Sequence, residues 1–217
     1  MRIVINHLTR MQPGYICVAG IDLDTGEHVR PVLTGRLPRR LLTQEGGIFE
    51  IGAVVELGAV KYAGRAPETE DYLFNPANAK VVQKLNDKQF WRTISKSAAD
   101  SLNEVFGDDL QPQGRGLALN LNKGAVSLGC LRTAKPPVLN IAQFFGKDRL
   151  RIGIFDAGIE YRISVTDIRL YEKDQVTLKY DEIRRIRQLL HSGEEAIMCV
   201  GVSRAWPKPG DSERRHW

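Results

Sequence analysis

The sequence predicts a mainly β protein with α-helical insertions, folded as two small barrels. Short segments rich in β-branched and aromatic residues, bounded by turn residues, occur near the N-terminus and again in the last third of the chain. A stretch with helical spacing separates the two groups of strands. This order, with one more helix before the last strand, fits two barrels better than a doubly wound sheet. We therefore expect an N-terminal barrel with a helical insertion over residues 1–110 and a C-terminal barrel over residues 111–217.

The first group of strands begins almost at the N-terminus. Residues 2–6 are rich in Val and Ile and predict a strand. Residues 15–22 and 28–32 predict a hairpin, because Asp24-Thr-Gly26 between them has the residues that tight turns favour. Residues 49–57 predict a further strand, which residues 60–62 continue past Gly58.

The middle of the chain, residues 76–107, has apolar residues at spacings of three and four, which predicts amphipathic helix. Asn86 and Asp87 separate two apolar groups, and either could cap a second helix. We favour Asp87 because the apolar pattern restarts three residues later. Gly107 is a typical helix stop.

Strands resume in the second half of the chain. Residues 116–121, 126–131 and 161–170 have strand character, and residues 150–155 alternate strictly between apolar and other side chains. Asp181 is expected to cap a helix that Gly193 ends, and residues 196–203 predict the last strand.

Composition is that of a water-soluble globular protein. The chain has 217 residues, 42% of them hydrophobic and 26% charged, with a net charge of +5. A basic balance fits nucleic-acid or other polyanion partners, although many basic proteins bind neither. Three cysteines without paired spacing predict reduced thiols and a cytoplasmic location. No apolar run approaches the ~18 residues of a membrane span, so no membrane partner is expected.

Several of these segments together resemble the dual OB-fold domain proteins of prokaryotes, which hold two oligonucleotide/oligosaccharide-binding barrels. The matching stretches are Cys17-Val-Ala-Gly20, His28-Val-Arg-Pro-Val32, residues 49–57, residues 160–167 and residues 200–206. The resemblance implies two small OB-like barrels and a general binding role. It implies no established reaction and no catalytic residues.

Candidate binding residues are arginines and an aromatic residue near strand ends. Arg30 could contact a phosphate or stack on a base; the plainer interpretation is a surface arginine paired with a carboxylate such as Glu27. Arg36, Arg39 and Arg40 form a basic loop that suits phosphates, or is simply a solvated run of charge.

A second basic and aromatic group follows the last predicted strand. Arg204, Trp206 and Lys208 combine stacking with phosphate neutralisation. The alternative is that Trp206 covers one end of a barrel. The three arginines of residues 184–187 are most simply the solvated face of their helix.

The sequence does not indicate an enzyme. The four histidines are scattered, no zinc-ligand spacing occurs, and there is no phosphate-binding loop. We therefore expect no catalytic residues, no metal and no cofactor. The preferred function is a nucleic-acid-binding module, for single-stranded or structured DNA or RNA. The alternatives are a protein-binding adaptor that uses Phe90-Trp91, and a metal-dependent nuclease that uses Asp22 and Asp24.

Overall fold

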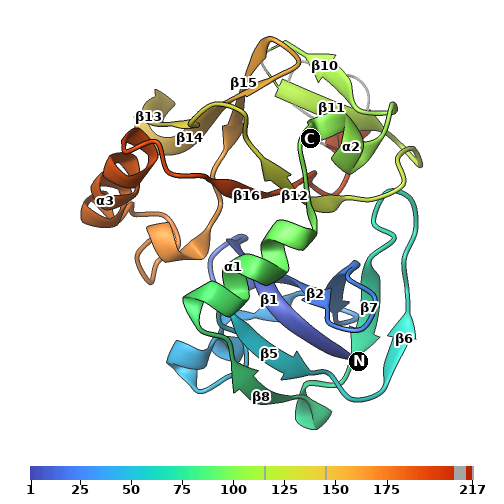
Figure 1. The fold of residues 1–217 in the computed structure, drawn as a ribbon. Coiled ribbons are helices and arrows are strands. Elements are labelled where there is room, and N and C mark those ends of the chain that lie inside the picture. The colour runs from blue at the N-terminus through green and yellow to red at the C-terminus, as the bar shows by residue number, and fades with distance from the viewer. Residues whose placement is uncertain (115, 145, 208–213, 217) are drawn as a thin grey trace. The chain divides into compact units, whose positions relative to one another are not determined.

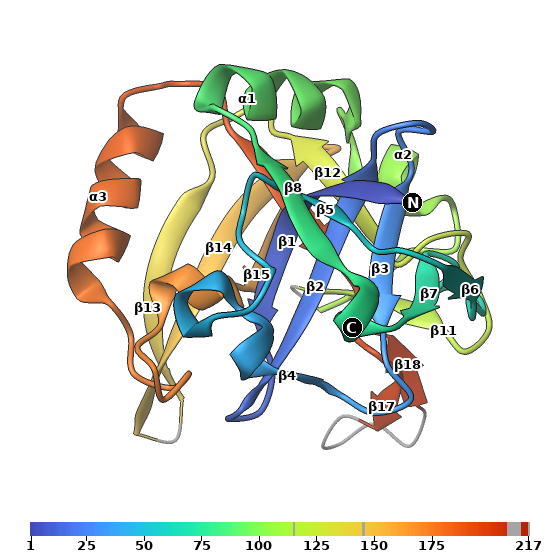
Figure 2. The same ribbon diagram turned by 90° about the horizontal axis from the view of Figure 1, so that it is seen from below.

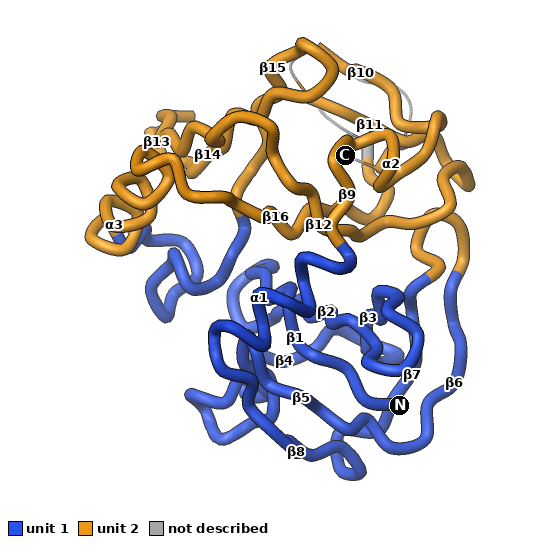
Figure 3. Tube along the Cα trace, viewed as in Figure 1, with its two compact units in different colours: residues 1–64, 70–97, 166–179 blue, residues 65–69, 98–165, 180–217 orange. Residues whose placement is uncertain are grey.

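The computed structural model describes residues 1–114, 116–144, 146–207 and 214–216. The chain forms two compact units, each built from segments that are separate in sequence (Figure 3). Unit 1 comprises residues 1–64, 70–97 and 166–179, and unit 2 comprises residues 65–69, 98–165 and 180–217. The sequence predicted two continuous halves that meet at residue 110. The assignment of one barrel to each half stays a prediction.

Unit 1 is built on one curled sheet with the strand order β6-β7-β3-β2-β1-β5-β8, and β4 pairs with β2 (Figures 1 and 2). Every pair is antiparallel except β3 with β7. The strands are β1 (Arg2–Arg10), β2 (Tyr15–Asp22), β3 (His28–Val32), β4 (Leu37–Pro38), β5 (Ala53–Glu56), β6 (Val60–Tyr62), β7 (Asp71–Phe74) and β8 (Lys80–Lys84). The helix α1 (Asp87–Lys96) follows β8.

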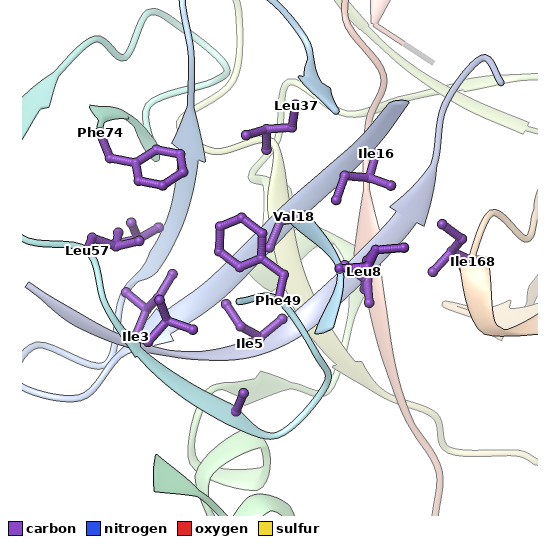
Figure 4. Close-up of a cluster of buried hydrophobic side chains, with 14 residues drawn as sticks. Ile3, Ile5, Leu8, Ile16, Val18, Leu37, Phe49, Leu57, Phe74 and Ile168 are labelled. Atoms are coloured by element: carbon purple, nitrogen blue, oxygen red, sulfur yellow. The ribbon is translucent and has the colours of Figure 1, made fainter. Parts of the chain in front are cut away.

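The core of unit 1 lies on one face of this sheet. Alternate residues of β1 and β2, such as Ile3, Ile5, Ile16 and Val18, are fully or almost fully buried there, as the period of a strand requires (Figure 4). Phe49, which is 1% exposed, packs edge-on against the ring of Phe74. Burial of this apolar face is the main favourable term that holds the strands together.

The middle of the chain is less helical than predicted. Residues 80–84 form β8, an edge strand paired with β5, where the spacing predicted helix. The β-branched Val81 and Val82 favour a strand, and the ladder to β5 decides the outcome. Helix α1 begins after Asn86, which accepts the backbone N–H of Gln89 and completes a capping box. Asn86 is therefore the cap, and the preference for Asp87 was wrong.

Unit 2 contains three small sheets, with the strand orders β10-β11-β18-β17, β16-β12-β9 and β13-β14-β15. Its strands are β9 (Ala98–Ala99), β10 (Gln111–Gln113), β11 (Gly116–Asn120), β12 (Leu128–Arg132), β13 (Val138–Phe144), β14 (Lys147–Asp156), β15 (Ile159–Ser164), β16 (Ile197–Gly201), β17 (Trp206–Pro207) and β18 (Arg214–His216). Its helices are α2 (Leu102–Phe106) and α3 (Tyr180–His191).

The core of unit 2 joins these sheets. Leu131 from β12, Ile154 from β14, Tyr161 from β15 and Val200 from β16 meet in one buried cluster. Helix α2 ends at Gly107, as predicted. Helix α3 starts one residue before Asp181, so this predicted cap lies in the first turn.

Helix α3 lies beside β13 (Figures 1 and 2). The Arg187 side chain fixes it there by donating from Nε to the backbone oxygen of Leu139 at 2.8 Å.

The predicted fold class, mainly β with helical insertions, is confirmed. Among the described residues, no helix is long and apolar enough to cross a membrane.

Candidate functional site

Arg30 of β3 is buried in ion pairs. Its side chain is 7% exposed, with Nε 2.5 Å from Asp71 Oδ1 and Nη2 3.8 Å from Glu70 Oε1. Burial alone would lower the pKa of Arg30, but the charges of Cys17, Asp71 and Glu70 and the hydrogen bond to Asp71 outweigh it and raise that pKa. The group is therefore a fixed cation that holds β3 to β7, out of reach of a ligand at the surface.

The basic loop of unit 1 contains one structural arginine and two exposed ones. Arg39 pairs with Glu45 at 3.1 Å and donates to the backbone oxygen of Lys173. Arg36 is exposed and lies 5.6 Å from the centroid of the Tyr15 ring. Arg40 is also exposed. The structure thus brings Arg36 and Arg40 to the surface and commits Arg39 to the fold.

Arg204 and Trp206 lie in unit 2, after β16. Arg204 pairs with Glu68 at 3.5 Å, and its side chain is 55% exposed. Trp206 stands directly opposite Arg215 of β18, which stands opposite Asn120 of β11. Opposite residues of antiparallel strands project from the same face. We call these three residues the Trp206 strip; Lys208 lies outside the described residues.

A larger basic surface lies on the three strands β13, β14 and β15. Their register puts alternate residues of each strand on the face opposite the core of unit 2. We call this surface the basic sheet face, and its members are Val138, Asn140, Ala142, Phe144, Lys147, Arg149, Arg151, Gly153, Phe155, Glu160, Arg162 and Ser164. It carries four cations and one carboxylate, and Phe155 is 37% exposed.

The cations on β14 are unpaired within the part of the chain that the structure describes. Lys147 and Arg149 are exposed and Arg151 is half-buried, and no described carboxylate pairs with any of the three. In contrast, Arg184 and Arg185 of α3 pair with acids of their own helix at 3.1 and 3.0 Å. Unpaired cations at alternate positions of one strand can neutralise an anionic chain laid across it.

This surface is not among the predicted binding residues, although the sequence contains a signal for it. The strict alternation of residues 150–155 was recognised as a strand, and extending the same period back by one residue puts Arg149 and Arg151 on one face. The acidic partners of Arg30 and Arg204 could not be identified in this way, because they come from segments that are distant in the sequence.

Asp22 and Asp24, the residues considered for a nuclease, lie in a hairpin turn and make contacts within it or beside it. Asp22 is 6% exposed, and its Oδ1 accepts the backbone N–H groups of Asp24 and Thr25 at 2.8 and 3.2 Å. Asp24 forms an exposed ion pair with Arg2 at 3.5 Å. These contacts are those of a hairpin turn.

Comparisons with known proteins give one match. The dual OB-containing domain matches residues 1–217. Neither the curated proteins nor the solved structures gave a match. Since the match covers the whole chain, and the strands curl into two units as the resemblance implies, the protein belongs to the dual OB-containing domain family.

Proposed function

We propose that the protein binds single-stranded nucleic acid and that unit 2 supplies the binding surface. The observation that carries this proposal is that Arg149 and Arg151, on the face of β14 away from the core of unit 2, have no ion-pair partner among the described residues. The guanidinium fork binds phosphate oxygens bidentately, and a charge without a protein partner is available to do so.

The place of this surface in the fold supports the proposal. OB-folds bind oligonucleotides on the face of their second and third strands and on the loops after the first and fourth. If β12 and β13 are taken as one interrupted first strand, β14 and β15 are the second and third. The loop after the fourth strand, β16, then carries Arg204 and leads to Trp206.

Aromatic side chains at these positions supply the second requirement of single-strand binding. Phe155 on the basic sheet face and Trp206, which is 42% exposed, can stack on unpaired bases. Stacking contributes about 1–3 kcal/mol per base and tolerates any sequence. Bases inside a duplex are not available for it.

Unit 1 lacks a comparable surface on its second and third strands. On the face of β2 and β3 away from the core of unit 1, Ala19 is fully buried and Arg30 is neutralised by Asp71 and Glu70. Unit 1 can add the exposed Arg36 and Arg40, but the main contact is assigned to unit 2.

The proposal is tested with a matched pair of double variants. Arg149→Ala/Arg151→Ala removes two unpaired charges, and Arg184→Ala/Arg185→Ala removes two paired charges from α3. Anisotropy of a labelled strand of about 12 nucleotides gives the affinity of each over a range of salt concentrations. We expect weaker binding only for the first variant, and a slope of log K against log salt that is shallower by about 1.4. Equal affinities for both variants would remove the basic sheet face from the site.

A protein partner is the second candidate, and one observation favours it. All five residues of β8 are exposed, including Val81 and Val82, and Trp91 of α1 is 39% exposed. An exposed edge strand can pair with an extended peptide of another protein. Two results together would favour this function. The wild-type protein would bind no nucleic acid, and a protein that it binds would no longer bind the Val82→Lys variant.

A further inference from the structure

We infer that Glu160 makes unit 2 selective for guanine in a single strand. This inference rests on the proposed function, since it names the base that the same surface prefers. Glu160 is the only carboxylate among the described residues of the basic sheet face, and its side chain is 38% exposed. A carboxylate repels phosphate, so the nucleotide part that meets Glu160 is a base.

The Glu160 carboxylate is held in place and only partly used. Arg162 donates from Nε to Oε1 at 3.1 Å, which orients the group. Among the described residues, nothing donates to Oε2. An ionised carboxylate accepts about four hydrogen bonds, so both oxygens retain lone pairs for a ligand.

Gly153 makes room for this arrangement. A Cβ built on Gly153 would lie 3.1 Å from Glu160 Oε1, closer than most carbon–oxygen contacts of this kind. The carboxylate therefore folds back over β14 because residue 153 has no side chain. Any larger residue there would push the Glu160 carboxylate away.

Phe155 brings a base to the carboxylate. It stands directly opposite Glu160 in the register of β14 and β15, which puts the two side chains about 5 Å apart at their Cβ atoms. The Lys135 ammonium lies 5.0 Å from the ring centroid and occupies one ring face. A base stacked on the other ring face directs an edge toward Glu160.

The hydrogen-bonding edge of guanine fits a carboxylate best. Guanine presents two adjacent donors, N1–H and N2–H₂, which match two carboxylate oxygens that only accept. Cytosine and adenine place a ring acceptor beside their amino group, and thymine and uracil flank their single N–H with two carbonyls. A bidentate contact of this kind discriminates by about 1–3 kcal/mol, which is at least about fivefold in affinity.

The test compares oligonucleotides that differ at one base. Three labelled strands of about 11 nucleotides are titrated with protein. One is oligothymidylate, the second has guanine in place of its central base, and the third has hypoxanthine there, which lacks the N2 amino group. We expect the guanine strand to bind at least about fivefold more tightly than oligothymidylate, with hypoxanthine between them.

Two variants and a control test the role of Glu160. In Glu160→Gln the ratio of the affinity for the guanine strand to that for oligothymidylate should fall to about one. The affinity for oligothymidylate should rise, because Arg162 loses its acidic partner. Gly153→Ala should also reduce the preference, without any change of charge. Glu182→Gln, which removes an equivalent ion pair on α3, should leave the preference unchanged. Urea unfolding verifies that each variant is folded.

The outcomes separate this inference from the proposed function. Equal, salt-sensitive affinity of the wild-type protein for all three strands would overturn guanine selectivity and leave the proposed function standing. A guanine preference that survives Glu160→Gln would also overturn it. If no strand binds at low salt, the proposed function fails as well.

Discussion

At the scale of single residues, arginine side chains in strands have different surroundings in the two units. Arg30 and Arg151 both lie within strands, yet Arg30 is enclosed by two acids and Arg151 has no described partner. The sequence could not separate them, because Asp71 is 41 positions from Arg30 and meets it only through the parallel pairing of β3 and β7. Pairing in three dimensions, which the sequence does not reveal, distinguishes an arginine that the fold neutralises from one that no described acid neutralises.

Replacement of Arg30 should therefore affect stability. Arg30→Ala leaves Asp71 and Glu70 buried without their cation, and we expect a loss of about 3–5 kcal/mol in the free energy of unfolding. Urea unfolding measures this loss. The control is Arg2→Ala, which breaks an exposed pair with Asp24 and should cost no more than about 1 kcal/mol. Similar values for both variants would show that the Arg30 cluster is not a structural centre.

At the scale of elements, periodicity predicted strands well and helices less well. The hairpin of β2 and β3 and the long strand β14 follow the alternation of the sequence, since one side of each faces a core. Residues 80–84 satisfied a helical spacing but form an edge strand, because pairing with β5 outweighs a short apolar pattern. Short patterns with two possible periods are decided by tertiary partners.

The segment of residues 166–179 is an element that the sequence could not place. It belongs to unit 1, where Gln175, 1% exposed, links it to the turn between β1 and β2. Gln175 accepts the N–H of Gly14 at 2.7 Å and donates to the oxygen of Tyr15 at 2.8 Å. Its own backbone oxygen accepts from Arg10 at 2.8 Å.

Loss of the Gln175 amide should loosen this segment. Gln175→Ala removes the two hydrogen bonds to the backbone of Gly14 and Tyr15, which we expect to cost about 1–3 kcal/mol. Hydrogen exchange of the backbone amides of residues 166–179 should accelerate, and the midpoint of urea unfolding should move to a lower urea concentration. Val176→Ala, at a neighbouring side chain that is 50% exposed, serves as the control. Unchanged exchange in Gln175→Ala would mean that other contacts hold the segment.

At the scale of the whole molecule, β2 and β3 of unit 1 differ from β14 and β15 of unit 2 in the surfaces that face away from the cores. In unit 1 Ala19 is buried and Arg30 is neutralised; in unit 2 Lys147 and Arg149 are exposed, and no described carboxylate pairs with either. The resemblance of short strand motifs was sufficient to predict the family and the fold class, because strand patterns recur in both units. It was not sufficient to predict which arginines are neutralised within the fold, because the acids that pair with Arg30 come from a distant segment.

The measurement that tests the central claim most directly is the affinity of the wild-type protein for a single strand and for the matching duplex. Anisotropy of a labelled mixed-sequence strand of about 12 nucleotides is recorded between about 50 and 200 mM salt. We predict tighter binding of the single strand than of the duplex, with log K falling linearly as log salt rises. Binding of the duplex as tightly as the single strand, or no binding of either at about 50 mM salt, would contradict the account.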